Sequence, residues 1–360
     1  MNILFFIPRM GSGGAERVIS VLSNSFVEKG HTVHIAQLIQ SESFYPLDER
    51  ITLSDMNIHI RRGNKLVALW DQARFFFKGV SYVKKEIKKR RPDAVIAFMR
   101  QSCIMMWVAR MFGCKTKLIC SERNDPTVQN ALVRRIMRRV YKSSDLLVCQ
   151  GKTVADYFSC VENKVVIPNP VNEEKLVARA EKITDRVVAV GRLDKQKNFE
   201  LLINSFAAVY PKFPEYRLDI YGEGPERNTL QALIDSKNMQ EHICLCGAKQ
   251  NVHELIADAS LFVMSSNYEG FPNALLEAMS IGLPVISTDF STGIAHELIG
   301  AENGRVVPTG DEEAMTNAIC ELLANSDLRK TMGERNRKEC EKFYIPQIIE
   351  KWEDAIRDIT

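Results

Sequence analysis

The second half of the chain alternates short apolar runs with segments whose apolar residues recur at helical spacing. The apolar runs cover residues 187–190, 216–221, 243–246 and 261–264, and the intervening segments predict helices over 198–210, 226–237 and 252–259. Strands that alternate with helices pair in parallel, because each helix returns the chain to the same end of the sheet. The alternation therefore predicts the α/β class, with helices on both faces of a parallel sheet.

The first half of the chain has the same rhythm. Apolar runs predict buried strands over 2–7, 32–38, 94–98, 117–120 and 146–149, and residues 51–60 are expected to form an extended edge segment. A chain of 360 residues is long enough for about two domains, each with its own core. We predict two Rossmann-like, doubly wound domains, 1–170 and 171–345, divided within the proline-bracketed segment 167–171, and a final helix over 346–360.

The net charge changes sign at this boundary. Residues 1–170 contain 27 lysines and arginines and 14 acidic residues, a net charge of +13, which leaves −10 for residues 171–360 because the whole chain carries +3. A domain of one charge sign attracts partners of the opposite sign. We therefore expect the first domain to meet an anionic partner.

A polar loop, residues 265–271, follows the apolar run 261–264, and Pro272 suits the first position of a helix after it. The first amides of a helix carry partial positive charge and lack intrahelical acceptors, so they suit a phosphate. The amides expected to be free are those of Asn273, Ala274 and Leu275.

Two carboxylates flank these amides, Glu269 before the helix and Glu277 one turn inside it. Each would be a solvated surface acid if it stood alone. Together with a helix start that suits phosphate, they favour a ligand that is part phosphate and part polyhydroxyl.

Cations and glycines follow other predicted strands. Arg192 and Lys197 come directly after the run 187–190, where they would neutralise a diphosphate or serve as surface charges at a helix start. Gly222 lies in the turn after residue 221. Gly13 and Gly14 follow the first strand, either to let a phosphate approach the backbone or to form a tight turn for packing.

The segment Glu269-Gly-Phe-Pro-Asn-Ala-Leu-Leu-Glu277, in which seven residues separate two glutamates, resembles the signature of the retaining family 4 glycosyltransferases. The turns Gly13-Gly14-Ala15-Glu16 and Gly222-Glu-Gly-Pro225 and the segment 167–171 are also similar to motifs of that family. The resemblance covers nearly the whole chain and is strongest over 187–307. It implies the GT-B fold, in which two Rossmann-like domains face each other across a cleft and the final helix crosses back to the first domain.

The resemblance also implies roles for individual residues. Glu269 would hold hydroxyls of the donor sugar, Glu277 would hold the ribose hydroxyls, and Arg192 with Lys197 would hold the diphosphate. The other donor-side candidates lie in the glycine turns, at the helix start and in a loop that is expected to read the base: Gly13, Gly14, Gly222, Ala248, Gly270, Phe271, Asn273, Ala274 and Leu275.

The loop 121–126 follows the predicted strand 117–120 and is dense in polar groups, at the end of a strand where ligands bind in open α/β sheets. Glu122 and Arg123 are therefore candidates for the acceptor side. Many members of the resembled family have a histidine at the position of Arg123, so no histidine role is transferred here. Arg123 would contact the acceptor or a phosphate, or else pair with Glu122 or Asp125.

Basic residues gather on two predicted helices of the first domain. Residues 61–91 combine eleven lysines and arginines with apolar residues at helical spacing, and a second cluster forms one basic stripe: Arg134, Arg135, Arg138, Arg139 and Lys142. Arg134 and Arg138 are further acceptor-side candidates. Such helices lie on an anionic membrane surface, bind lipid-linked phosphates, or are ordinary solvated faces. With the resemblance, they favour a saccharide or polyprenyl-diphosphate-linked acceptor at the cytoplasmic face of a bacterial membrane.

Metal-ligand spacings are missing from the sequence. The nine cysteines form no Cys-x-x-Cys pair, the six histidines form no His-x-x-x-His pair, and no Asp-x-Asp occurs. We expect no metal, no cofactor besides a nucleotide-sugar co-substrate, and no nucleic-acid partner. Residues 1–7 lack the basic start and cleavage site of a signal peptide, and the unpaired cysteines suit a reducing cytoplasm.

Three other functions compete with glycosyl transfer. An oxidoreductase needs the fingerprint Gly-x-Gly-x-x-Gly, whose third glycine is replaced here by Glu16. A nucleotide-sugar epimerase or phosphorylase of GT-B shape would act on the donor without this acceptor. A non-catalytic membrane scaffold explains the basic half but not Arg192, Lys197, Glu269 and Glu277 together.

We predict a metal-independent, anomer-retaining hexosyl- or N-acetylhexosaminyltransferase that uses a UDP-sugar in bacterial surface-glycan synthesis. Because the sequence offers no clear nucleophile, we expect attack on the same face as the leaving group, with a donor phosphate oxygen accepting the acceptor's proton.

Overall fold

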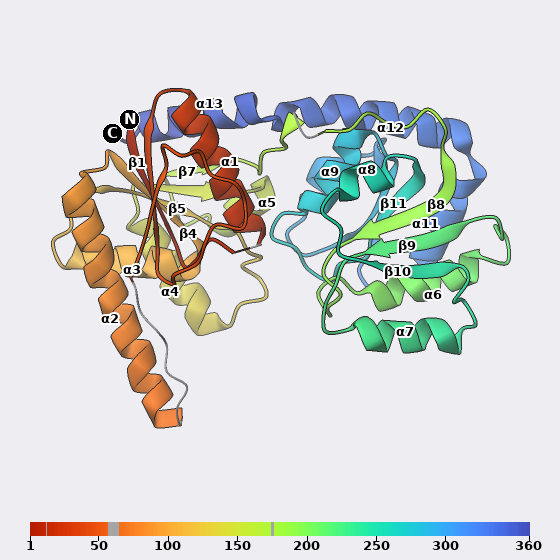
Figure 1. The fold of residues 1–360 in the computed structure, drawn as a ribbon, viewed down its shortest axis with the longest axis horizontal. Coiled ribbons are helices and arrows are strands. Elements are labelled where there is room, and N and C mark those ends of the chain that lie inside the picture. The colour runs from red at the N-terminus through yellow and green to blue at the C-terminus, as the bar shows by residue number, and fades with distance from the viewer. Residues whose placement is uncertain (12, 57–64, 174–175) are drawn as a thin grey trace. The chain divides into compact units, whose positions relative to one another are not determined.

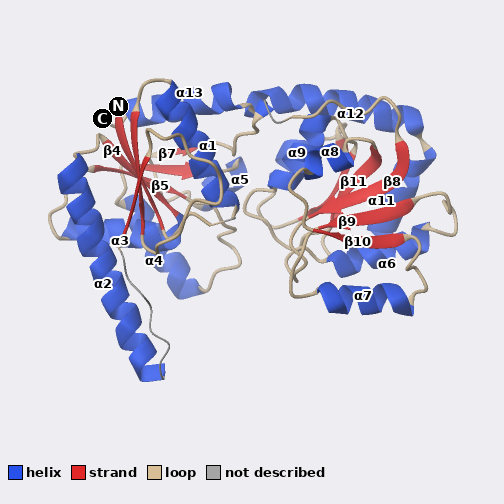
Figure 2. Cartoon of the chain, viewed as in Figure 1, coloured by secondary structure: helices blue, strands red, loops and turns tan. Residues whose placement is uncertain are grey.

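The computed structural model describes residues 1–11, 13–56, 65–173 and 176–360. The described chain forms two compact units, Met1–Pro170 with Ile345–Thr360, and Val171–Tyr344 (Figure 1). Each unit is built on a parallel sheet with helices packed on it (Figure 2). The predicted α/β class with two Rossmann-like domains is thus confirmed.

In the first unit, the described strands form a sheet in the order β3-β2-β1-β4-β5-β6-β7, and every pair is parallel. The strands are Asn2–Ile7 (β1), Thr32–Gln37 (β2), Thr52–Asp55 (β3), Ala94–Phe98 (β4), Lys117–Ser121 (β5), Leu146–Cys149 (β6) and Lys164–Val166 (β7). The helices are Gly14–Glu28 (α1), Lys65–Arg90 (α2), Met99–Met111 (α3), Ala131–Lys142 (α4), Lys152–Tyr157 (α5) and Ile345–Arg357 (α13).

In the second unit, the described strands form a parallel sheet in the order β10-β9-β8-β11-β12-β13. The strands are Thr184–Val190 (β8), Arg217–Tyr221 (β9), Ile243–Gly247 (β10), Ala259–Met264 (β11), Val285–Asp289 (β12) and Gly304–Pro308 (β13). The helices are Phe199–Val209 (α6), Arg227–Ser236 (α7), Val252–Ile256 (α8), Asn273–Ile281 (α9), Ile294–Ile299 (α10), Glu312–Ala324 (α11) and Ser326–Cys340 (α12), with a 3₁₀ turn, Glu341–Phe343 (η2).

The winding of each sheet reverses at one point. In the second unit the chain runs outward from β8 through β9 to β10, and then returns to place β11 on the other side of β8. The same reversal separates β1 from β4 in the first unit. Helices on opposite faces leave a crevice at such a switch point, at the carboxyl ends of the strands, and ligands of open α/β sheets bind there.

The helix after β10 is shorter than predicted, and the segment expected over 51–60 is described only in part. The helix expected over 252–259 ends at Ile256, because Ala259 already pairs with Thr184 as the first residue of β11. The extended segment expected over 51–60 contains β3, which pairs in parallel with β2 over Thr52–Asp55. Its residues 57–60 lie outside the described part of the chain.

Helix α13 completes the core of the first unit. Trp352 on this helix is fully buried and stacks on Phe98 at the end of β4, with ring centroids 6.3 Å apart. Beside it, the Glu353 carboxylate accepts hydrogen bonds from Lys29 Nζ at 2.9 Å and from His31 Nε2 at 2.7 Å. Apolar packing and a charged cluster therefore both hold α13 in this unit.

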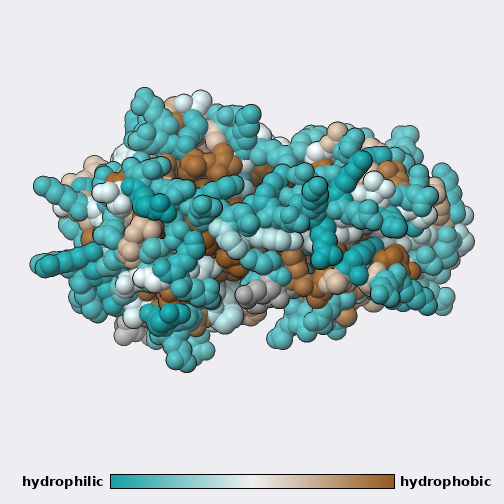
Figure 3. Space-filling model, turned by 90° about the horizontal axis from the view of Figure 1, so that it is seen from above, coloured by the Kyte–Doolittle hydropathy of each residue, from teal (hydrophilic) through white to brown (hydrophobic). Residues whose placement is uncertain are grey.

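Hydrophilic residues cover most of the face drawn in Figure 3, and hydrophobic residues form small separate patches on it. No described helix is both long enough and apolar enough to span a lipid bilayer. Several large apolar side chains of the first unit are nevertheless exposed, at α2, at the end of α3 and around the start of α4: Phe77, Met111, Phe112, Val128 and Leu132.

The loops after β8 and β9 pack main chain against main chain. Gly222 has φ +154°, and a Cβ atom there would lie 1.8 Å from the carbonyl oxygen of Gly191. A Cβ atom at Gly224 would lie 2.3 Å from the carbonyl oxygen of Leu193. Backbone hydrogen bonds join the same loops, from Leu193 to Glu223 at 3.0 Å and from Glu226 to Leu193 at 2.9 Å. Glycine at 222 is therefore required by space as well as by φ.

We predict that Gly222→Ala lowers the free energy of unfolding of the second unit by about 3 kcal/mol or more, because the new methyl group overlaps a hydrogen-bonded main chain. Gly310→Ala is the matched control, since Gly310 has φ +79° but open space around its Cα. The control is expected to cost about 1–2 kcal/mol, from backbone strain alone. Urea unfolding of both variants measures the difference, and equal losses would contradict the steric argument.

Candidate active site

The carboxyl end of β8 meets that of β11 at the switch point of the second sheet. Because the two strands are parallel neighbours, the loops that follow them, 191–198 and 265–272, leave the sheet at the same edge. Asn198 fixes the end of the first loop in a left-handed conformation, φ +47°, which asparagine tolerates better than most residues. Its side chain caps α6 through the amide of Leu201 and also donates to Asn267 in the second loop, at 3.0 Å.

Further hydrogen bonds join the two loops. The backbone amide of Asn267 donates to the Gln196 carbonyl oxygen at 2.7 Å, and the side-chain amide of Asn267 donates to the Lys195 carbonyl oxygen at 2.8 Å. Ser265 Oγ donates to the Lys197 carbonyl oxygen at 2.9 Å. This dense bonding sets the relative position of the two loops before any ligand arrives.

Lys197 and Glu269, predicted from sequence to share a site, are in direct contact. Lys197 Nζ lies 2.5 Å from Glu269 Oε1, and Ser266 Oγ donates to the same oxygen at 2.7 Å. Gln196 Nε2 lies 3.4 Å from the other oxygen, Oε2. The Glu269 side chain is only 8% exposed, and burial of a carboxylate is costly unless such donors compensate it. The fold therefore places a hydrogen-bonded, oriented carboxylate at the switch point.

Arg192 occupies the same loop but has a different environment. Its side chain is 72% exposed, and its guanidinium pairs with Asp194 at 2.6 Å. Asp194 also accepts from the amides of Gln196 and Lys197 at 3.1 Å, so it shapes the loop. Arg192 is therefore positioned as a surface cation beside the site, whereas Lys197 is an inner one.

Helix α9 begins one residue later than predicted. Pro272 is the N-cap, with φ −84°, and Asn273 is the first helical residue. The Asn273 amide donates to the Phe271 carbonyl oxygen at 3.0 Å, so the prediction that this amide is free was wrong. The reason is a tight turn through Pro272. Ala274 and Leu275 are the next first-turn residues, whose amides have no acceptor within a helix.

The loop before α9 and the neighbouring helix α8 complete this part of the site. Phe271 is buried and Gly270 is half-buried in the loop that leads to the helix. On α9 itself, Glu277 Oε2 lies 2.9 Å from Nε2 of His253, which belongs to α8. Sequence reasoning did not identify His253, because it lies 24 positions before Glu277 and no motif links the two.

The loop that the resemblance assigns to base recognition, which contains Ala248, directly follows β10. Ala248 is exposed, and Gly247 before it has φ +75°. The carbonyl oxygen of Gly247 accepts from the Gly222 amide at 3.0 Å. The exits of β9 and β10 are therefore adjacent, and Gly222 lies between the exits of β8 and β10.

The glycine turn of the first unit is filled by a carboxylate. Gly13 is the N-cap of α1 and Gly14 its first residue. A Cβ atom at Gly13 would lie 2.3 Å from a carboxylate oxygen of Glu16, which is itself 8% exposed. The Glu16 carboxylate therefore packs directly against the Gly13 main chain, and a side chain at position 13 would require Glu16 to move.

Glu122 and Arg123 are both buried at the exit of β5. The Glu122 carboxylate accepts from the amides of Arg123 and Asn124 at 3.0 Å and from the Tyr141 hydroxyl at 2.7 Å. Burial raises the pKa of Glu122, although these hydrogen bonds oppose the shift. Glu122 therefore stabilises the conformation of the loop that follows β5.

The side chain of Arg123 bonds to an amide oxygen rather than to the two acids considered above. Its Nη1 donates to Asn169 Oδ1 at 2.6 Å, and its guanidinium carbon lies 4.5 Å from the Phe98 ring centroid and 5.8 Å from that of Trp352. Nε and Nη2 are buried without a hydrogen-bond partner among the described residues. Burial lowers the pKa of Arg123 to about 9. A buried cation with two unused donors is suited to an anionic or hydroxyl-rich ligand.

Helix α4 presents its arginines to solvent. Arg135, Arg138 and Arg139 are exposed and Arg134 is half-buried, while Met137, Val140 and Tyr141 are buried on the opposite side. The guanidinium of Arg138 lies 5.5 Å from the ring centroid of Tyr157. The predicted basic stripe is therefore a surface feature.

No group of three or more His, Cys, Asp or Glu side chains in the described chain is arranged to hold a metal ion. The nine cysteines are all free thiols.

Two family models together match most of the chain. Residues 171–339 match "Glycosyl transferases group 1", and residues 12–175 match "Glycosyltransferase Family 4". The boundary between the two matches coincides with the division of the chain into two units.

Curated relatives match over nearly their full lengths. The chain is 27% identical to the amylovoran biosynthesis glycosyltransferase AmsD of Erwinia amylovora, over 96% of both chains. It is 29% identical to the N-acetylgalactosamine-N,N'-diacetylbacillosaminyl-diphospho-undecaprenol 4-alpha-N-acetylgalactosaminyltransferase of Campylobacter jejuni, over 94% of both chains.

Solved structures share the fold. A sucrose-phosphate synthase of Thermosynechococcus elongatus superposes with a TM-score of 0.84 at 17% identity, over 100% of this chain and 99% of that chain. HepE of Anabaena superposes with a TM-score of 0.82 at 16% identity, over 99% and 100%. With the fold, the two family matches and the curated relatives in agreement, the chain belongs to the family 4 glycosyltransferases and has the GT-B fold.

Proposed function

We propose that this protein transfers a hexose or N-acetylhexosamine from a UDP-sugar to a saccharide or polyprenyl-diphosphate-linked saccharide, with retention of anomeric configuration. The observation that supports this most strongly is the contact of Lys197 with the buried Glu269 carboxylate at the switch point of the second sheet. A fixed cation, a fixed carboxylate and the start of α9 at one sheet edge suit a ligand with a diphosphate and several hydroxyls.

In this proposal the second unit binds the donor. Lys197 has three N–H donors, so its ammonium can keep Glu269 in place while it donates to a diphosphate oxygen. The exposed Arg192 and the amides of Ala274 and Leu275 supply further donors to the same diphosphate. Glu269 accepts from hydroxyls of the sugar, and Glu277 accepts from hydroxyls of the ribose.

Glu269 is better suited to holding the sugar than to attacking it. Lys197 and Ser266 both donate to its Oε1, and Gln196 lies near its Oε2, so several of its lone pairs are already engaged. We therefore propose that the acceptor hydroxyl attacks from the face that the diphosphate leaves, while a phosphate oxygen takes the hydroxyl proton. The enzyme contributes orientation and stabilises the negative charge that develops on the diphosphate.

The first unit is proposed to bind the acceptor. Two buried nitrogen atoms of Arg123, Nε and Nη2, have no hydrogen-bond partner among the described residues and can donate to an acceptor hydroxyl or phosphate. The names of two Campylobacter jejuni relatives specify acceptors carried on undecaprenol diphosphate, and the name of the Erwinia relative specifies amylovoran biosynthesis. These names support a role in bacterial surface-glycan synthesis on a lipid-linked or polysaccharide acceptor.

Such an acceptor places the enzyme at the inner face of the cell membrane. On α4, the exposed Arg135, Arg138 and Arg139 accompany the apolar Leu132, which is 68% exposed, and Val128 just before the helix is 57% exposed. Cations beside protruding apolar side chains are typical of surfaces that rest on anionic lipid. We propose peripheral attachment through this surface, with the basic end of α2 as a second contact.

Nucleotide binding tests the donor site. We expect a thermal shift with UDP, and we expect Lys197→Ala to weaken UDP binding roughly 10- to 100-fold, because hydrogen bonds to charged groups contribute about 1.5–3 kcal/mol. GDP, ADP and CMP complete the panel and identify the base. Lys237→Ala, an exposed lysine of the same unit, is the control and should bind as wild type does. The absence of a shift with any nucleotide would contradict the proposed function.

Azide tests the retaining mechanism. With same-face attack and no glycosyl-enzyme intermediate, a Glu269→Ala enzyme supplied with azide and donor is expected to give no inverted β-glycosyl azide. Nuclear magnetic resonance of the products makes the distinction. Accumulation of that product would indicate that Glu269 acts as a nucleophile, as carboxylates do in double-displacement enzymes.

Vesicle binding tests the membrane surface. Charge reversal of Arg135, Arg138 and Arg139 to Glu is expected to abolish sedimentation with phosphatidylglycerol vesicles, because each basic residue near such a surface contributes about 1 kcal/mol. UDP binding should be unchanged. Reversal of Lys237 and Lys330 in the second unit is the control. Unaltered sedimentation of the α4 variant would instead identify the stripe as a solvated face.

A further inference from the structure

Helix α8 brings an imidazole to the carboxylate that the proposed function assigns to the ribose. His253 Nε2 lies 2.9 Å from Glu277 Oε2, and the two side chains are only 20% and 13% exposed. An ionised carboxylate can only accept, so the proton in this contact is on Nε2 and the imidazole donates. Glu277 is therefore held by a neighbouring element as well as by its own helix.

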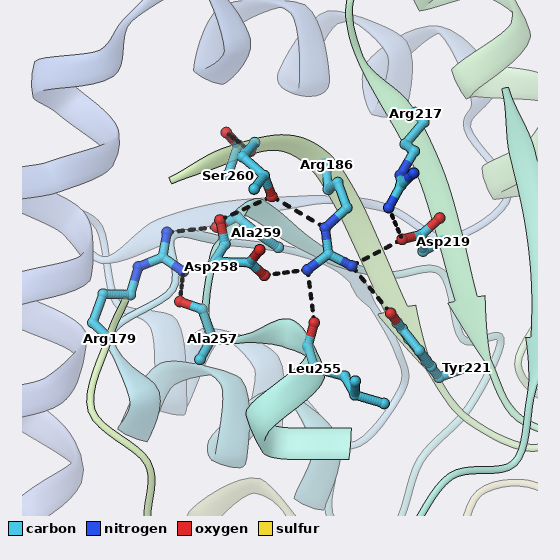
Figure 4. A network of polar contacts seen from close by, with 11 residues as sticks. Arg179, Arg186, Arg217, Asp219, Tyr221, Leu255, Ala257, Asp258, Ala259 and Ser260 are labelled. Atoms are coloured by element: carbon cyan, nitrogen blue, oxygen red, sulfur yellow. Dashed lines mark hydrogen bonds and ion pairs between the residues drawn. The ribbon is translucent and has the colours of Figure 1, made fainter. Parts of the chain in front are cut away.

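An arginine network fixes α8 against the sheet (Figure 4). Arg186 on β8 donates through Nη2 to the carbonyl oxygen of Leu255 at 2.7 Å and pairs through the same group with Asp258. Its Nη1 donates to Asp219 on β9 at 2.9 Å and to the Tyr221 hydroxyl at 3.1 Å. A single guanidinium thus joins the end of α8 to two strands.

A second arginine holds the residues that follow α8. Arg179 donates to the carbonyl oxygens of Ala257 at 2.6 Å and of Ala259 at 2.5 Å. The last carbonyl groups of a helix have no intrahelical donor, and here two guanidiniums supply the missing hydrogen bonds. Because α8 has only five residues, these charged contacts rather than a long apolar face set its position.

We propose that His253 is a positioning residue for the nucleotide, which holds the Glu277 carboxylate ready to accept from the 2′- and 3′-hydroxyls of the donor's ribose. This inference rests on the proposed function, which places the ribose at Glu277. A carboxylate has about four acceptor sites, so a hydrogen bond from the imidazole is compatible with further bonds from two hydroxyls.

Orientation by His253 has a specific consequence for recognition. A glutamate side chain has several rotatable bonds, and fixing it before binding removes part of the entropy cost of fixing it on binding. The benefit applies only to ligands that use the carboxylate. His253 is therefore a determinant of the preference for ribose over deoxyribose, because a site built for a hydroxyl rejects the analogue that lacks it.

Calorimetric titration with UDP and 2′-deoxy-UDP tests this directly. Wild type is expected to prefer UDP by about tenfold or more, as for loss of a hydrogen bond to a charged group. In His253→Ala the preference should fall to about threefold or less, with 2′-deoxy-UDP weakened by a smaller factor than UDP, because the deoxy ligand keeps only its 3′-hydroxyl bond to Glu277. His253→Gln, which retains an N–H donor, should recover most of the preference.

A double-mutant cycle separates positioning from simple packing. In a Glu277→Ala background the preference for UDP is already lost, and adding His253→Ala should change neither affinity further. His242→Ala is the matched control, because His242 contacts the Tyr210 ring, with ring centroids 4.1 Å apart, and has no assigned role. Both affinities should be as in wild type in this control. Unfolding midpoints of all variants show whether each one is folded.

Two results would overturn the inference while leaving the proposed function intact. If the contact only joins α8 to α9, His253→Ala would weaken the binding of UDP and of 2′-deoxy-UDP by the same factor. An unchanged preference in His253→Ala would show that Glu277 needs no support. GDP and ADP with their 2′-deoxy forms are titrated in parallel, and failure of wild type to bind any of these diphosphates would overturn the proposed function together with the inference.

Discussion

The second unit depends on the close approach of main-chain segments at one edge of its sheet. Parallel strands deliver their carboxyl ends to the same edge, and the loops after β8 and β9 then pack so tightly that Gly222 leaves no space for a side chain against the Gly191 carbonyl group. The loops after β8 and β11 are joined as closely, through Asn267 and Ser265. Main-chain packing and hydrogen bonds therefore fix the loops at this edge, and the loops in turn position the side chains of the site.

The contact of Lys197 with Glu269 illustrates what this rigidity allows. A carboxylate that is almost fully buried is unfavourable unless its partners are fixed, and here the partners come from two loops that are themselves hydrogen-bonded together. Removing the loop contacts would leave a buried charge without orientation. Because these side chains are in position before a ligand binds, less reorganisation accompanies binding and reaction.

The sequence predicted the sheet-forming runs and the position of Glu269, because buried strands are continuous apolar runs and because a polar loop directly follows one of them. It could not predict His253 opposite Glu277, or Asn169 beside Arg123, since these partners are brought together by the packing of separate elements. The Asn273 amide was predicted to be free, and it bonds to Phe271 because Pro272 closes a turn that propensity alone does not specify. Local patterns therefore identified elements and candidate residues, and tertiary packing decided their partners.

The placement of α13 in the first unit has a consequence for biosynthesis. The chain completes the seven strands of that unit's described sheet by Val166, yet Trp352, which stacks on Phe98, is made only after the entire second unit. A nascent first unit therefore has its strands but lacks part of its core. Its apolar surface around Phe98 stays uncovered while about 185 further residues are translated at roughly 5–20 residues per second. For several seconds or longer, this apolar surface is exposed to solvent.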